Sequence, residues 1–180
     1  RKEVHDRIAK EHPELAERFK ERRHLLDEHL KERRPEDLAE YHPVRDGDVF
    51  DLGGVTWKVI HCPGHTPGSL ALFDEAGRTL VTGDTVSEAS VYMFGRARSH
   101  QDYKETLNTL GSRYGGLVDT ILPSHGECTL TGLHELTEDL LAALGRFECG
   151  LAEDELVELR SGVTVKLYRH GRGAVLAEEL

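Results

Sequence analysis

Three short segments of the sequence each place a side chain that could bind a metal ion directly after an apolar stretch. They are VIHCPGHTPGS at residues 59–69 with His65, LVTGDT at residues 80–85 with Asp84, and ILPSHGE at residues 121–127 with His125. Imidazole and carboxylate groups are donors that Zn²⁺ and Fe²⁺ accept, and one carboxylate can bridge two ions about 3.5–4 Å apart. Together the three residues predict a metal centre.

Each of these side chains is expected at the end of a predicted β-strand, where the chain turns sharply. Proline and glycine in the first segment favour a tight loop that can hold the His65 imidazole rigidly. His65 and Asp84 lie 19 residues apart, which leaves room for a hairpin, and Asp84 and His125 lie 41 apart, which leaves room for a helical crossover. All three side chains can therefore meet at one sheet edge. Singly, such a histidine is more often structural and such an aspartate is usually a turn residue.

The surrounding pattern predicts a single α/β domain. Alternating apolar residues around Gly53-Gly54 predict a β-hairpin at residues 49–60. Further strands are expected at residues 69–73, 79–81 and 118–122, with a terminal hairpin at 163–168 and 174–176. Helical spacing of apolar residues predicts helices at residues 101–112 and 133–147, with Thr131 as the N-cap of the second.

Residues 1–47 are a separate, highly charged segment whose pattern is helical. Apolar residues recur along it at spacings of about four and seven, which gives a thin stripe: Val4, Ile8, Leu15, Phe19, Leu26 and Leu30. The stripe could pack on the rest of the domain, cover a pocket, or pair with a second subunit. Packing is its ordinary use, and a homodimer is the alternative.

The composition is that of an acidic globular protein of 180 residues, with 33 acidic and 23 basic side chains and a formal net charge of −10. This charge repels phosphate backbones, so we expect a small-molecule substrate and no nucleic-acid partner. No apolar run approaches the roughly 20 residues that would span a bilayer, so no membrane partner is expected. Cys62, Cys128 and Cys149 are an odd, widely spaced set, which predicts a reduced, cytoplasmic protein.

The three segments resemble the third, fourth and fifth metal motifs of the metallo-β-lactamase superfamily in their order and spacing, over about residues 48–180. PGHTPGS is highly specific to that family, whereas TGDT and PSHG would be weak alone. The resemblance implies an α/β fold, the αββα sandwich, with a one- or two-metal centre at a sheet edge. It also implies that His65 binds the first metal, that His125 binds the second, and that Asp84 bridges them.

The family's front motif, His-x-His-x-Asp-His, is not found in these 180 residues. Without it each ion keeps two protein ligands, fewer than the three of a catalytic zinc site. The chain opens Arg-Lys-Glu and its only methionine is Met93, so we expect the native start and the motif to lie upstream. Residues 48–180 are then the C-terminal part of the domain, and the 180 residues alone should have weak or no activity.

By this resemblance the intact protein is expected to be a hydrolase of a small ester, thioester or lactone, similar to hydroxyacylglutathione hydrolase. Two zinc ions are the expected cofactors, with iron or manganese as alternatives, and a metal-bound hydroxide is the expected nucleophile. Asp84 would be catalytic by holding the metals and the nucleophile in line. The alternative is a non-catalytic oligomerisation or partner-binding module from a split or degenerate protein of this family.

The loop after Asp84 should overhang the metals, so its aromatic and basic residues are candidate walls of a substrate pocket: Tyr92, Phe94, Arg96 and Arg98. Arg96 or Arg98 could pair with a substrate carboxylate, and a solvated loop is the alternative.

Further polar residues lie close to the ligand positions in the sequence. Ser124 and Glu127 are candidates to orient His125. His61 is expected to be structural or to support a ligand, and Cys62 and Cys128 are expected to be small buried side chains rather than ligands.

Overall fold

The structure, a computed structural model, describes residues 42–94, 98–151, 156–159 and 164–177. The chain divides into two compact units, of which the second comprises residues 44–159 and 163–180. Residues 1–41, with the predicted helical segment and its apolar stripe, lie outside the described residues, and so does Arg96.

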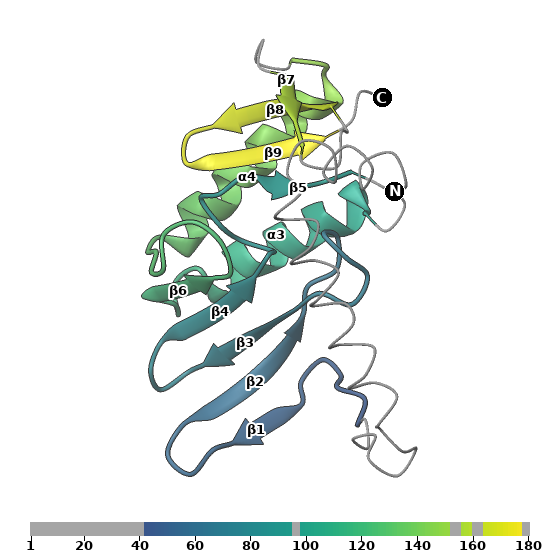
Figure 1. The fold of residues 1–180 in the computed structure, drawn as a ribbon. Coiled ribbons are helices and arrows are strands. Elements are labelled where there is room, and N and C mark those ends of the chain that lie inside the picture. The colour runs from purple at the N-terminus through teal and green to yellow at the C-terminus, as the bar shows by residue number, and fades with distance from the viewer. Residues whose placement is uncertain (1–41, 95–97, 152–155, 160–163, 178–180) are drawn as a thin grey trace, which may run out of the picture. The chain divides into compact units, whose positions relative to one another are not determined.

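The first sheet has five strands in the order β1-β2-β3-β4-β6 (Figure 1). They are β1 (Val49–Asp51), β2 (Thr56–His61), β3 (Leu70–Asp74), β4 (Thr79–Gly83) and β6 (Thr120–Pro123). The β1–β2 hairpin turns at Gly53 and Gly54, which both adopt the positive φ angles that a tight hairpin requires. Neighbours are antiparallel except β4 and β6. A parallel pair needs a crossover connection, and a helix provides it here.

The second sheet has four strands in the order β5-β9-β8-β7. They are β5 (Val91–Tyr92), β7 (Leu156–Glu158), β8 (Thr164–His170) and β9 (Gly173–Ala177). The predicted terminal hairpin is therefore confirmed as β8 and β9. β5 pairs with β9 in parallel, so the segment that follows Asp84 becomes an edge strand of the second sheet.

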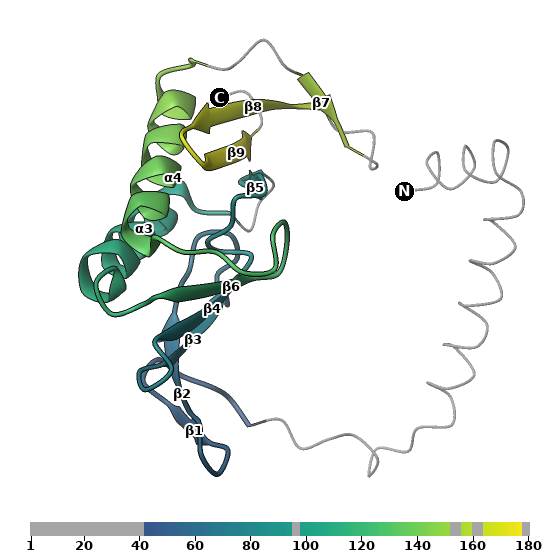
Figure 2. The same ribbon diagram turned by 90° about the vertical axis from the view of Figure 1, so that its left-hand side faces the viewer.

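Two helices pack against each other, α3 (His100–Tyr114) and α4 (Leu133–Glu148). Figure 2 shows them on the same side of both sheets. Ser99 caps α3 by accepting a hydrogen bond from the Asp102 backbone N–H. The predicted N-cap of α4, Thr131, is wrong: Gly132 holds that position in a left-handed conformation with no side-chain cap. Thr131 instead uses its carbonyl, which accepts from Arg172 at 2.9 Å.

The main core lies between the helices and the sheets. From α3 it takes the predicted apolar face, Tyr103, Leu107 and Leu110, all fully buried. The helix α4 contributes the buried leucines Leu133, Leu136, Leu140 and Leu144 to this core, and the strands contribute residues such as Leu80 and Ile121. Each such side chain contributes about 1.5–3 kcal/mol when fully buried. This packing fixes the strand ends that carry the candidate metal ligands.

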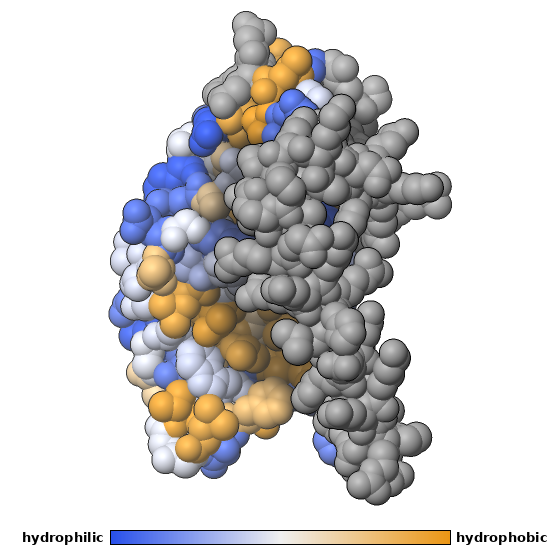
Figure 3. Space-filling model, viewed as in Figure 1, coloured by the Kyte–Doolittle hydropathy of each residue, from blue (hydrophilic) through white to orange (hydrophobic). Residues whose placement is uncertain are grey.

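The opposite face of the first sheet is also apolar. The strand register places Phe50 beside Trp57, and Leu72 between Val59 and Val81. Phe50 is 44% exposed, and apolar surface gathers over β1 to β4 in Figure 3. Among the described residues, no helix combines the length and apolarity that crossing a membrane would need.

Candidate metal site and pocket

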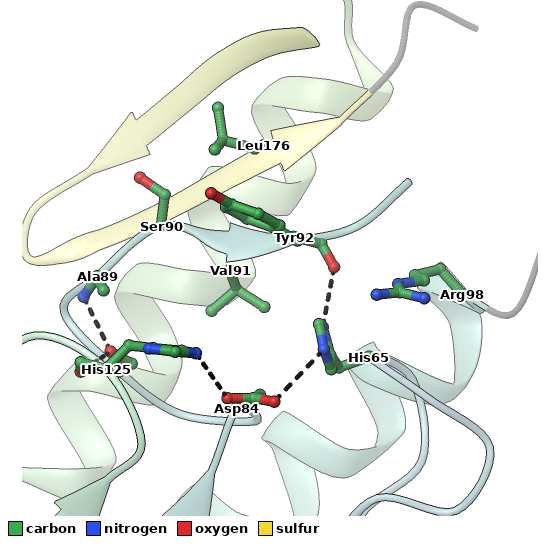
Figure 4. Close-up of a pocket in the computed structure, with 10 residues that line it drawn as sticks. His65, Asp84, Ala89, Ser90, Val91, Tyr92, Arg98, His125 and Leu176 are labelled. Atoms are coloured by element: carbon green, nitrogen blue, oxygen red, sulfur yellow. Dashed lines mark hydrogen bonds and ion pairs between the residues drawn. The ribbon is translucent and has the colours of Figure 1, made fainter. Parts of the chain in front are cut away.

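Three loops bring the predicted ligands to one edge of the first sheet. His65 follows β2, Asp84 follows β4 at once, and His125 follows β6. Because β4 and β6 are parallel neighbours, their carboxyl ends lie side by side and deliver Asp84 and His125 to the same place. The structure thus brings together the three residues that the sequence pattern selected (Figure 4).

The two oxygens of Asp84 face two different imidazoles. Asp84 Oδ2 lies 3.7 Å from Nε2 of His65, and Asp84 Oδ1 lies 3.3 Å from Nε2 of His125. Two donor atoms about 2.1 Å from one tetrahedral ion lie about 3.4 Å from each other. Each His–Asp pair therefore has the spacing and donor types of two ligands of one ion, with the carboxylate shared between the pairs.

The two pairs differ in their access to solvent. The His65 side chain is 12% exposed, Asp84 is 45% exposed and His125 is 72% exposed. Within the described ranges, no group of three or more His, Cys, Asp or Glu side chains could hold one ion together. Each pair supplies two donors, one fewer than a catalytic zinc site uses.

The His65 ring is oriented by a backbone carbonyl. Its Nδ1 lies 2.9 Å from the carbonyl oxygen of Tyr92. Because a carbonyl can only accept, Nδ1 carries a proton, and Nε2 is the ring nitrogen that faces Asp84. A hydrogen bond to the other ring nitrogen is the usual support of a metal-binding histidine. Sequence reasoning missed this contact, because a backbone carbonyl leaves no signal in residue type.

The loop that carries His65 is fixed against α3. Gly64 has φ +133°, and a Cβ at this position would lie 2.5 Å from the Tyr103 Cα atom, so only glycine fits. The Ser99 backbone N–H donates to the Gly64 carbonyl at 3.0 Å, and the Thr106 hydroxyl donates to the Pro63 carbonyl at 2.8 Å. The imidazole therefore sits on a segment held next to the helix N-terminus.

The Asp84 loop is held by the same helix. The buried Tyr103 hydroxyl donates to the Thr85 carbonyl at 2.7 Å, and the Thr82 hydroxyl donates to the Val86 carbonyl at 2.7 Å. Burial raises the pKa of Tyr103 well above its ordinary value, so the phenol remains a donor at any physiological pH. Tyr103 thus supports the loops of both His65 and Asp84.

The His125 loop is tied to the Asp84 loop. The Ser124 backbone N–H donates to the Gly83 carbonyl at 3.0 Å, and the Ser87 hydroxyl donates to the His125 carbonyl at 2.8 Å. In the part of the chain that the structure describes, neither the Ser124 nor the Glu127 side chain makes a hydrogen bond or ion pair with the His125 ring. Ser87, which the sequence pattern did not single out, is the residue that positions this segment.

A pocket of about 530 Å³ opens over these three residues. Its apolar wall includes Val91, Tyr92 and Leu176, and its polar wall includes Arg98 beside the candidate ligands. Of the other predicted pocket residues, Phe94 does not line this pocket; its ring packs 5.3 Å from that of Tyr92 and against the second sheet. Arg96 lies outside the described residues.

The remaining candidates have structural positions. His61 Nε2 lies 2.9 Å from the Pro67 carbonyl, so this ring supports the His65 loop. Cys62 is fully buried as predicted, and burial raises the pKa of its thiol to about 12. The expectation that Cys128 is buried is wrong: it is exposed, because it lies on the irregular loop between His125 and Leu130.

The family model of the metallo-beta-lactamase superfamily matches residues 1–125, a range that includes His65 and Asp84 and ends at His125. The chain belongs to the metallo-beta-lactamase superfamily.

Several proteins of known sequence are similar over part of the chain. The acyl-coenzyme A thioesterase MBLAC2 from Homo sapiens is 36% identical over 85 residues, which are 46% of this chain and 30% of that protein. Hydroxyacylglutathione hydrolase GloC from Haemophilus influenzae is 24% identical over 99 residues, which are 54% of this chain and 46% of that protein. The chain spans between 23% and 52% of the lengths of the curated relatives it matches.

A solved structure shares the fold. A metallo-beta-lactamase family protein of Thermus thermophilus superposes with a TM-score of 0.52 at 22% identity, covering 65% of this chain and 40% of that one. The mixed sheets and two helices agree with the predicted C-terminal part of the αββα sandwich.

Proposed function

We propose that the intact protein is a metal-dependent hydrolase of a small ester, thioester or lactone. One observation carries this proposal: the two oxygens of Asp84 face the Nε2 atoms of two different histidines at 3.7 and 3.3 Å. A shared carboxylate between two imidazoles is the donor arrangement that bridged metal pairs use.

The residues of this chain would hold the metals and shape the reaction site. A metal ion bound there would lower the pKa of a bound water far below its value in bulk water, to about 7, which would make hydroxide available at neutral pH. The Tyr92 carbonyl accepts the Nδ1 proton of His65, so Nε2 is the nitrogen that would bind a metal ion. Tyr103 and Ser87 keep the ligand loops in place, while Tyr92 and Leu176 form part of an apolar wall of the pocket.

The relatives favour thioesters as the substrate class. MBLAC2 is named as an acyl-coenzyme A thioesterase and GloC as a hydroxyacylglutathione hydrolase, so both names describe the cleavage of an acyl group from a thiol. We extend this class to the present chain as a proposal, with two zinc ions as the expected metals and iron or manganese as alternatives. A cytoplasmic location and a homodimer remain predictions.

Replacing the shared carboxylate tests the proposal. In the natural full-length protein, we expect about two metal ions per chain by elemental analysis. Asp84→Asn should lower the metal content by at least one ion and lower thioesterase activity by more than about 100-fold, because even the hydrogen-bond partners of ligands contribute 10- to 100-fold.

Asp119→Asn is the matched control. Asp119 is an exposed carboxylate that pairs with Arg78 at 2.6 Å, just before β6 begins, and its loss should leave metal content and activity unchanged. A full-length protein that binds no metal and hydrolyses no thioester, yet still binds a partner protein, would favour the non-catalytic module instead.

A further inference from the structure

Arg98 is a cation without an anionic partner in the described part of the chain. Two other arginines there pair with acids, Arg78 with Asp119 and Arg172 with Glu88. The Nε atom of Arg98 is buried and has no hydrogen-bond partner. In a chain with ten more acidic than basic side chains, a buried guanidinium nitrogen left unpaired requires an explanation.

The free guanidinium faces the candidate reaction site. Arg98 lines the pocket together with His65 and Asp84, and Figure 4 shows its guanidinium end directed toward His65 and the Tyr92 carbonyl. Asp84 is the acidic residue of that pocket lining, and both of its oxygens already face histidines. The pocket therefore contains a positive group that its own lining does not neutralise.

The backbone fixes Arg98 relative to His65. Arg98 directly precedes Ser99, the N-cap of α3, whose backbone N–H donates to the Gly64 carbonyl at 3.0 Å. Gly64 directly precedes His65, so one hydrogen bond joins the two segments immediately beside both side chains. An oxyanion held by Arg98 would consequently sit at a defined place beside the candidate metal ligands.

The chemistry of the guanidinium identifies what it would bind. Its planar N–H donors match carboxylate and phosphate oxygens, and such charge-assisted bonds strengthen where water is excluded. An unpaired donor buried away from water is unfavourable until a ligand satisfies it. The Nε atom of Arg98 is such a buried donor, and the pocket that it lines also has the apolar side chains of Val91 and Leu176 in its wall.

We infer that Arg98 binds a carboxylate or phosphate group of the substrate, so that the site prefers anionic thioesters over neutral ones. The part of this inference that concerns catalysis rests on the proposed function, whereas the oxyanion site itself does not. Glutathione carries carboxylates and coenzyme A carries phosphates, and a guanidinium group binds both kinds of group through the same charge-assisted hydrogen bonds.

A matched pair of substrates tests the inference in the natural full-length protein. S-acetyl-3-mercaptopropionate carries a carboxylate, and S-acetyl-N-acetylcysteamine is a neutral thioester of similar size. Arg98→Gln should lower the ratio of kcat/KM for the anionic over the neutral substrate by roughly tenfold or more, mainly through KM. Arg98→Lys should restore part of this ratio, and Arg113→Gln, an exposed position at the far end of α3, should leave it unchanged.

A binding measurement decides the site without turnover. In metal-free, ¹⁵N-labelled protein, the Nε–Hε signal of Arg98 should shift and saturate when acetate or inorganic phosphate is added at constant ionic strength. The relative affinities of these probes distinguish a carboxylate site from a phosphate site. Arg146 is the internal control, because its Nε is also buried without a partner but Arg146 does not line the pocket.

The outcomes separate the two proposals. An equal loss on both thioesters in Arg98→Gln, or an Arg98 signal that shifts no more than that of Arg146, would overturn the oxyanion site. If the full-length protein hydrolyses neither thioester, the proposed thioesterase activity fails, and the titration of the Arg98 signal then decides the oxyanion site alone.

Discussion

Single residues at this site are held in defined chemical states by their surroundings. The Tyr92 carbonyl fixes the tautomer of His65, and burial keeps the Cys62 thiol neutral. The sequence pattern was sufficient to select His65, Asp84 and His125, because side-chain type and spacing carry the signal for metal donors. It could not find the contact of the Tyr92 carbonyl or the contribution of Ser87, since any residue has a carbonyl and serine occurs in most loops.

The state of Cys62 leads to a prediction about thiol reactivity. With a pKa raised to about 12, only about one Cys62 thiol in a thousand is ionised at pH 9, and the thiolate is the reactive form. Alkylation of the folded chain by iodoacetamide at pH 9, followed by mass spectrometry, should therefore modify the exposed Cys128 and Cys149 and leave Cys62 unmodified. Modification of Cys62 at a similar rate would contradict its burial.

The same thiol makes stability dependent on alkaline pH. Its pKa is raised in the folded chain from 9.0 to about 12, so the unfolded chain loses this proton first. The neutral Cys62 thiol therefore makes its full contribution to the stability of the folded chain below pH 9, and this contribution is lost as the pH rises toward 12. The free energy of unfolding should fall over that range and fall less steeply in Cys62→Ala, as measured by urea denaturation. Identical slopes in both proteins would exclude this contribution.

At the scale of elements, α3 is the support shared by two ligand loops. Its Tyr103 contacts Gly64 through the backbone and the Asp84 loop through the hydroxyl. The long elements could be predicted from the sequence, because their apolar period is clear over several residues. The strands β5 and β7 could not, since two or three residues show no period. The Gly132 cap was missed because residue type favoured Thr131.

Substitutions at two glycines of the same loop test whether close packing against α3 restrains that loop. Gly64→Ala places a Cβ 2.5 Å from the Tyr103 backbone at φ +133°, and we expect it to lower the free energy of unfolding by at least about 2 kcal/mol. Gly68→Ala meets no atom within 4 Å and should change it by no more than about 0.5 kcal/mol. Chemical denaturation measures both, and similar values for the two variants would show that α3 does not restrain this loop.

At the scale of the molecule, one end of the first sheet exposes apolar side chains. Val49, Phe50, Leu52 and Val55 are all at least 41% exposed on β1 or the β1–β2 turn, and β1 is an edge strand. Unprotected apolar edge strands promote pairing between chains. This surface could not be anticipated from the sequence, because the apolar alternation that predicts a strand does not tell whether both faces are covered.

Lysine substitutions at this edge should reduce self-association. Val49→Lys combined with Leu52→Lys changes the two most exposed residues of this group, and its effect on folding stability should stay near 0.5 kcal/mol per site. Sedimentation velocity over a range of concentrations should show less association than in the unaltered chain. The control Leu151→Lys with Leu156→Lys adds the same charge at leucines of similar exposure. If this control reduces association equally, the effect is one of net charge and not of the β1 edge.

Tyr92 contributes to substrate fit through its side chain and to the orientation of a candidate metal ligand through its main chain. Its side chain forms part of the pocket wall, while its main-chain oxygen steers the imidazole of His65. Substitution at position 92 can therefore alter which acyl groups fit without removing the acceptor that steers the ring. A protein built in this way can diversify its choice of substrate while its metal-binding geometry is inherited unchanged.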